Sequence, residues 1–93
     1  MKSANVEGLR LSALSKGDQG VVRGIDTHAH PGGIDPAELE RRLLEMGFVE
    51  GARVQVLHEG LFGRDPIAVK LDDMRVALRR GDADAILLEK AAP

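Results

Sequence analysis

Residues Ile67-Ala68-Val69-Lys70-Leu71-Asp72-Asp73-Met74-Arg75-Val76-Ala77-Leu78-Arg79 form two runs in which large apolar side chains alternate with other residues. A period of two is typical of a strand with one buried face, and two turn-forming residues between such runs predict a tight hairpin. We therefore predict two antiparallel strands joined by Asp72 and Asp73. Turn propensity explains these adjacent carboxylates better than a catalytic role does.

Three further strands are predicted around this hairpin. One follows the turn at 16–18 and includes 21–25, one contains the alternating residues 53–56, and the last covers 86–89, after a break at 81–82 and a single turn through 83–85. An open sheet of five short strands would leave two exposed edges, which curling into a barrel removes. The predicted fold class is therefore mainly β, a small SH3-like β-barrel of about five strands with one short amphipathic helix.

The predicted helix lies between Asp35 and Gly47. Asp35 suits the N-cap, Pro36 suits the first helical position, and Glu38 completes a capping box. Gly47 can adopt the left-handed conformation that commonly ends a helix. The apolar residues recur at helical spacing and include Leu39, Leu43, Leu44 and Met46.

Composition limits the chain to one domain with an aliphatic core, because 93 residues are 43% hydrophobic but only 2% aromatic. We expect the domain to cover 9–90, with a flexible tail at 1–8 and another at 91–93. The absence of cysteine excludes disulfides and thiolate metal sites, and a small secreted domain usually needs such links. We therefore expect a cytoplasmic protein.

Charge and hydropathy exclude two classes of partner. Thirteen basic and fifteen acidic residues are interspersed, so nucleic acid is not an expected partner. The longest aliphatic run, 85–88, is far shorter than the roughly 20 residues of a membrane-spanning helix, and no secretory signal is recognisable at the start. Direct membrane insertion is therefore not expected.

Catalytic motifs are absent from the sequence. It contains neither a nucleophile elbow nor a Walker loop, and the few hydroxyl side chains, at Ser3, Ser12, Ser15 and Thr27, lie in no recognisable constellation. We predict that the chain is not an enzyme and has no cofactor, with a divalent metal ion as the one alternative.

The order of residues in three segments resembles the FeoA family. These segments are 42–51 (RLLEMGFVEG), which is followed by Val54 and Val56, then 63–69 (GRDPIAV) and 76–80 (VALRR). The resemblance extends from Leu11 to Glu89, and similar barrels form the carboxy-terminal domain of DtxR-type iron regulators. It implies a cytosolic accessory protein of ferrous iron uptake that binds and modulates the FeoB GTPase transporter through protein–protein contacts. The oligomeric state stays open.

Two neighbouring features are candidates for partner binding. Leu61 and Phe62 lie between glycines in an inter-strand connection, where they either contact another protein or cover an open end of the barrel. Arg64 beside them could supply a polar rim. Arg79 and Arg80 at a strand end should point to opposite faces, so that one is exposed; it would either bind acidic groups or protect the strand edge.

His28 and His30 are weak candidates for metal ligands. They belong to a segment, His28-Ala29-His30-Pro31-Gly32-Gly33, that is longer than the connection associated with the family. Asp26, Asp35 or His58 could supply a third ligand, but none is determined by its spacing, and a solvated polar loop is the alternative. A metal-ion-responsive regulatory domain that uses this loop is therefore the alternative function.

Overall fold

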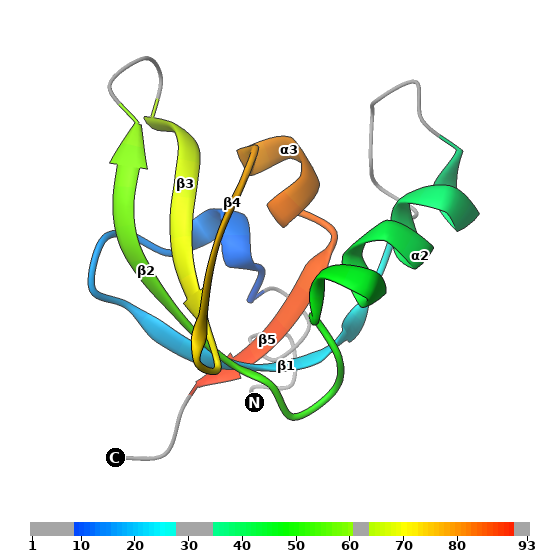
Figure 1. Cartoon of the computed structure of the whole chain (residues 1–93), viewed down its shortest axis with the longest axis horizontal. Helices are drawn as coiled ribbons and strands as arrows, with labels where there is room; N and C mark the ends of the chain where they lie inside the picture. Colours follow the sequence, from blue (N-terminus) through cyan, green and yellow to red (C-terminus); the bar gives the residue numbers. More distant parts are fainter. Residues whose placement is uncertain (1–8, 28–34, 61–63, 91–93) are drawn as a thin grey trace, which may run out of the picture.

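The computed structural model describes residues 9–27, 35–60 and 64–90, without the side chain of Arg64. Within these ranges the chain forms five strands and three short helical segments (Figure 1). In chain order they are the 3-10 helix η1 (Leu11–Ala13), strand β1 (Gln19–Ile25), helix α2 (Pro36–Met46), strands β2 (Arg53–Gly60), β3 (Arg64–Leu71) and β4 (Met74–Leu78), helix α3 (Arg80–Ala83) and strand β5 (Ile86–Lys90).

The five strands form one curved antiparallel sheet in the order β4-β3-β2-β1-β5. Helix α2 lies to one side of the sheet, and α3 lies close to η1 (Figure 1). Most inward residues of the strands are aliphatic and buried, as at Val54, Val69 and Leu88. The predicted fold class, a mainly β SH3-like barrel with one short amphipathic helix, is confirmed.

The predicted hairpin is present between β3 and β4. Leu71 pairs with Met74, and only Asp72 and Asp73 lie between them. Asp72 adopts a φ of 53°, which aspartate tolerates better than most residues do. Its carboxylate accepts a hydrogen bond from the Arg53 amide at 3.0 Å, and its own amide donates to the Arg53 carbonyl at 2.8 Å. The turn is therefore tied to β2.

The two edges of the sheet differ, which corrects the expectation that barrel formation removes both. In the described residues β4 and β5 do not pair with each other. The segment before η1 covers part of the β5 edge, because Leu88 donates to the Leu9 carbonyl at 3.0 Å and Arg10 bridges Leu87. No described segment covers β4 in this way, so this strand edge is open within the described part of the chain.

Helix α2 begins and ends where the sequence predicts. The Asp35 carboxylate accepts a hydrogen bond from the Glu38 amide at 3.1 Å. At the other end Gly47 has a φ of 114°, its amide donates to Leu44, and the Phe48 amide donates to Leu43. These two bonds form a Schellman motif, whose apolar residues Leu43 and Phe48 are both buried in the core.

The segment after β4 differs from the sequence prediction. We expected the strand to continue to Arg79 and Arg80 and a turn at 83–85, but β4 ends at Leu78 and α3 begins at Arg80. The Asp65 carboxylate accepts a hydrogen bond from the Arg80 amide at 2.7 Å, and Ala83 is fully buried. Contacts distant in sequence therefore end the strand early.

Replacing Gly47 with alanine is expected to lower the free energy of unfolding by about 1–2 kcal/mol, because a residue with a Cβ is strained at this φ. The added Cβ would also lie 3.1 Å from Leu71 Cδ2. Urea denaturation would measure the loss. The matched control is Gly81→Ala in α3, where an added Cβ meets no atom of the described residues within 4 Å and stability should stay equal or rise. Equal effects at both positions would contradict the prediction.

Candidate functional site

Two of the four partner-binding residues predicted from the sequence, Arg64 and Arg79, fall at one end of the β3–β4 hairpin. Leu61 and Phe62 lie outside the described residues. Arg64 begins β3, and Arg79 directly follows β4 and is exposed. Because Ile67 pairs with Leu78, Arg79 lies opposite the start of β3. The backbone thus brings Arg64, at the start of β3, close to Arg79, which directly follows β4.

The metal site predicted at His28 and His30 falls outside the part of the chain that the structure describes. No cluster of three metal-binding side chains occurs within that part. Two proposed third ligands have other roles. Asp26 Oδ2 accepts a hydrogen bond from Arg10 Nη2 at 3.0 Å, and the Asp35 carboxylate caps α2.

Arg80 is held in a network that joins α3, β2, η1 and the loop after η1. Its Nη2 lies 2.7 Å from Glu59 Oε1 on β2, and its Nη1 donates to the Ser12 carbonyl of η1 at 2.5 Å. The other carboxylate oxygen of Glu59 accepts from the Lys16 amide at 3.0 Å. The side chains of Arg80 and Glu59 are 15% and 21% exposed. This network is a structural clamp at the end of the barrel where Arg79 lies.

A second arginine, Arg10, forms hydrogen bonds near the same end of the barrel. Arg10 Nη1 donates to the Asp84 carbonyl at 2.8 Å, and Ser12 Oγ donates to the Asp84 carboxylate at 2.7 Å. The segment that leads into η1 is thereby attached to the end of α3. The sequence prediction that one member of the Arg79–Arg80 pair is exposed is correct: Arg79 is exposed, whereas Arg80 is held in the clamp.

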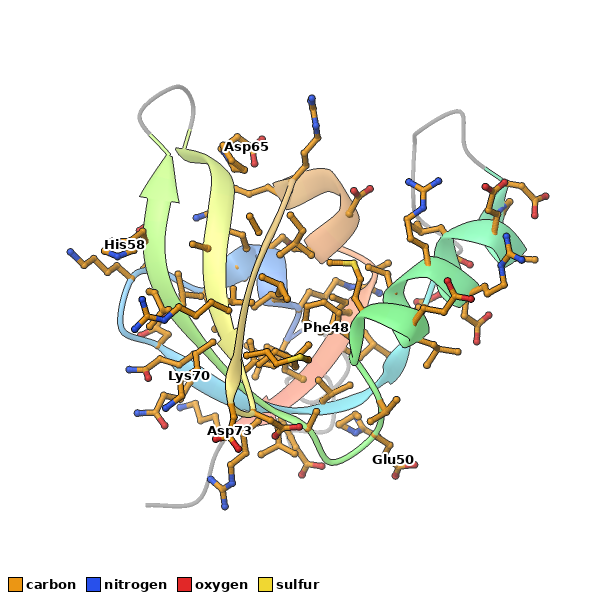
Figure 2. The ribbon with its side chains drawn as sticks, viewed as in Figure 1. Phe48, Glu50, His58, Asp65, Lys70 and Asp73 are labelled. Carbon is orange, nitrogen blue, oxygen red and sulfur yellow. The ribbon has the colours of Figure 1, made fainter. Side chains whose placement is uncertain are left out.

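The outer face of the sheet is basic around β3 and β4. The register places Gln55, Lys70 and Arg75 in one row across β2, β3 and β4. Figure 2 shows Lys70 and His58 pointing away from the barrel on the same side, whereas Phe48 lies in its interior. An open hollow of about 580 Å³ beside Lys70 is lined mainly by polar residues, including Gln19, Arg53 and Asp73. The sequence analysis did not identify this face.

Three large apolar side chains are exposed in the described residues. Leu44 on α2, Val49 after it and Met74 at the start of β4 are 43%, 47% and 51% exposed. An alanine Cβ at Gly47 would lie 3.5 Å from Met74 Cε, so Met74 reaches the end of α2. No described helix is long and apolar enough to cross a membrane.

Comparison with known families and proteins gives consistent matches. Residues 9–90 match the model of the FeoA domain. A fusion protein of Porphyromonas gingivalis, which joins Fe(2+) transport protein A to the Fe(2+) transporter FeoB, is 37% identical over 81 residues. That match covers 87% of this chain but only 8% of the fusion protein.

Solved structures share the fold. Stenotrophomonas maltophilia FeoA, described as a prokaryotic SH3 domain protein and crystallised with zinc, is 32% identical with a TM-score of 0.68. The match covers 87% of this chain and 89% of that protein. A manganese-dependent transcriptional repressor is 28% identical with a TM-score of 0.71, over 89% of this chain and 41% of the repressor. The expected similarity to both FeoA proteins and metal-dependent regulators is confirmed.

Proposed function

The chain belongs to the FeoA domain family, which is associated with ferrous iron transport, and we propose that it binds a FeoB-type transporter and modulates its activity. The observation that carries this proposal is the Porphyromonas gingivalis fusion, in which a FeoA-like segment and FeoB form one polypeptide. Fusion holds two modules at a high effective concentration, which favours even a weak mutual contact. In separate chains the same contact must form between two proteins.

In this proposal the protein acts in the cytoplasm as a non-catalytic accessory. Its contact would be with the cytosolic part of the transporter, where the GTPase domain of FeoB-type proteins is expected from the family resemblance. Exposed Arg79 and the neighbouring start of β3 support a contact at this end of the barrel. Leu61, Phe62 and Arg64 complete the proposed contact as its apolar centre and rim.

We expect the separately produced cytosolic part of the FeoB-type transporter to co-purify with the wild-type chain. Co-purification with Leu61→Ser/Phe62→Ser should be strongly reduced. Loss of two apolar anchors removes most of the binding energy of a small contact. Leu44→Ser is the matched control, since Leu44 is an exposed leucine on α2. Circular dichroism should first establish that each variant is folded.

Failure of the wild-type chain to co-purify at high concentration would contradict the proposed partnership. Equal binding by wild type and the double variant would contradict only the proposed contact. The manganese-dependent repressor with the same fold makes a metal-responsive domain the alternative. A divalent-metal effect that disappears in His28→Ala/His30→Ala would favour that alternative.

A further inference from the structure

Strand β4 presents unused backbone hydrogen-bonding groups. The two-residue turn makes Leu71 and Met74 a hydrogen-bonded pair. Along an antiparallel hairpin such pairs alternate with non-hydrogen-bonded pairs, whose N–H and C=O groups point away from the partner strand. The N–H and C=O groups of Arg75 and Ala77 therefore point away from β3. Among the described residues, no segment bonds to these groups from the other side. An edge of this kind is a template for one further strand.

The outward side chains of this edge are mainly cationic and form no ion pair with the described carboxylates. Arg75 lies directly opposite Lys70, and like charges in that position destabilise a sheet. In the described residues no carboxylate oxygen lies within 4.0 Å of the cationic groups of Lys70, Arg75 or Arg79. The protein as a whole has a net charge of −2, so this cationic group is a local feature. Acidic side chains on an added strand would relieve the repulsion.

The inward side of the same edge is apolar. Met74 is 51% exposed, Val76 is partly buried and Leu78 is buried. Residues of an added strand that lie opposite these three would face the same side, because side chains alternate along every strand. Residues opposite Arg75, Ala77 and Arg79 would face the cationic side. The small Ala77 leaves the backbone between the two arginines accessible.

We propose that β4 binds an extended segment of a partner protein, in which acidic and apolar residues alternate, as a sixth strand of the sheet. The acidic residues would lie beside Arg75 and Arg79, and the apolar residues would cover Met74 and Val76. This inference rests on the proposed function, because the segment would belong to the transporter. A second copy of this chain would not bind well at this edge. Antiparallel pairing about Ala77 would place Arg75 of one copy opposite Arg79 of the other, and opposed like charges destabilise a sheet.

The probe for this site is a blocked seven-residue peptide, Ser-Glu-Val-Glu-Val-Glu-Ser, titrated into the isotopically labelled full chain and followed by NMR. We expect the amide signals of Arg75 and Ala77 to shift most, and binding to weaken as salt is added. A peptide with lysine at each glutamate should not bind. Arg75→Glu/Arg79→Glu should weaken binding by roughly tenfold or more, and Arg41→Glu/Arg42→Glu, an equal charge change on the exposed face of α2, should leave it unchanged.

Ala77→Pro separates strand addition from simple charge attraction. The amide of Ala77 points outward, so proline there removes no bond between β3 and β4, and proline is tolerated at such edge positions. The variant should stay folded, judged by its dispersed spectrum, and should lose peptide binding. Arg75→Glu/Arg79→Glu tests the same site if this variant does not fold. Shifts away from β4, binding of the lysine peptide, or no shift at millimolar peptide would overturn the proposal.

Co-purification with the transporter distinguishes this inference from the proposed function. If the wild type binds and Arg75→Glu/Arg79→Glu does not, while Arg41→Glu/Arg42→Glu does, the β4 site is supported. If both variants bind as well as the wild type, the β4 site is wrong and the proposed function stands. If the wild type does not bind the transporter, the proposed function fails, and the peptide titration alone decides whether β4 accepts an acidic strand.

Discussion

Replacing Phe48 with alanine is expected to lower the free energy of unfolding by about 3–5 kcal/mol. Phe48 is fully buried and directly follows the glycine that ends α2, where it packs in the same core as Leu43. Alanine would leave a cavity among side chains held by both the helix and the sheet. For a small domain with a total stability of roughly 5–15 kcal/mol, such a loss is a large fraction.

Thermal denaturation followed by circular dichroism would measure the effect of Phe48→Ala as a fall in Tm of roughly 15–30 °C. Phe48→Leu keeps most of the buried volume and should cost less than about 1.5 kcal/mol. Val49→Ala is the control for the neighbouring position, because Val49 is 47% exposed and its truncation should change the stability little. A melting temperature of Phe48→Ala close to that of Val49→Ala would show that Phe48 does not anchor α2.

Local patterns predicted most of the fold because each has a local cause. The alternation around Asp72 and Asp73 predicted the hairpin, and that turn forms within a few residues. The caps at Asp35 and Gly47 predicted both ends of α2 for the same reason. The end of β4 was predicted too late, because it depends on the Asp65 carboxylate, which is distant in the sequence from the amide that it binds.

The candidate surface was predicted only in part. Pattern analysis expected one arginine of the 79–80 pair to be exposed because adjacent residues of a strand point to opposite sides. Arg79 is exposed, but for another reason, since Arg80 begins α3 instead of continuing the strand. The pattern did not indicate the partner of the other arginine, because Glu59 and Arg80 are 21 residues apart and no periodicity joins them. The open edge of β4 was missed for a related reason: edge status depends on strand order, which the hydrophobic pattern alone does not determine.

Replacing Arg80 with methionine is expected to lower the free energy of unfolding by about 2–3 kcal/mol. Methionine keeps much of the apolar stem but removes the Arg80 guanidinium from beside the Glu59 carboxylate, which is 21% exposed, and from the Ser12 carbonyl. The elements joined by this clamp are distant in the chain, so its loss should also loosen the end of the barrel. Urea denaturation would measure the stability, and amide hydrogen exchange would show increased opening of η1 and α3.

Arg42→Met is the matched control for the clamp. Arg42 forms an ion pair with Glu38 on the exposed surface of α2, at 3.5 Å and with 56% of its side chain exposed. Such a pair contributes only about 0.5 kcal/mol, because water and salt screen it. A double-mutant cycle with Glu59→Gln would isolate the coupling between Glu59 and Arg80. If Arg80→Met and Arg42→Met were equally mild and the coupling vanished, packing alone would hold this end of the barrel, and the clamp would have no energetic role.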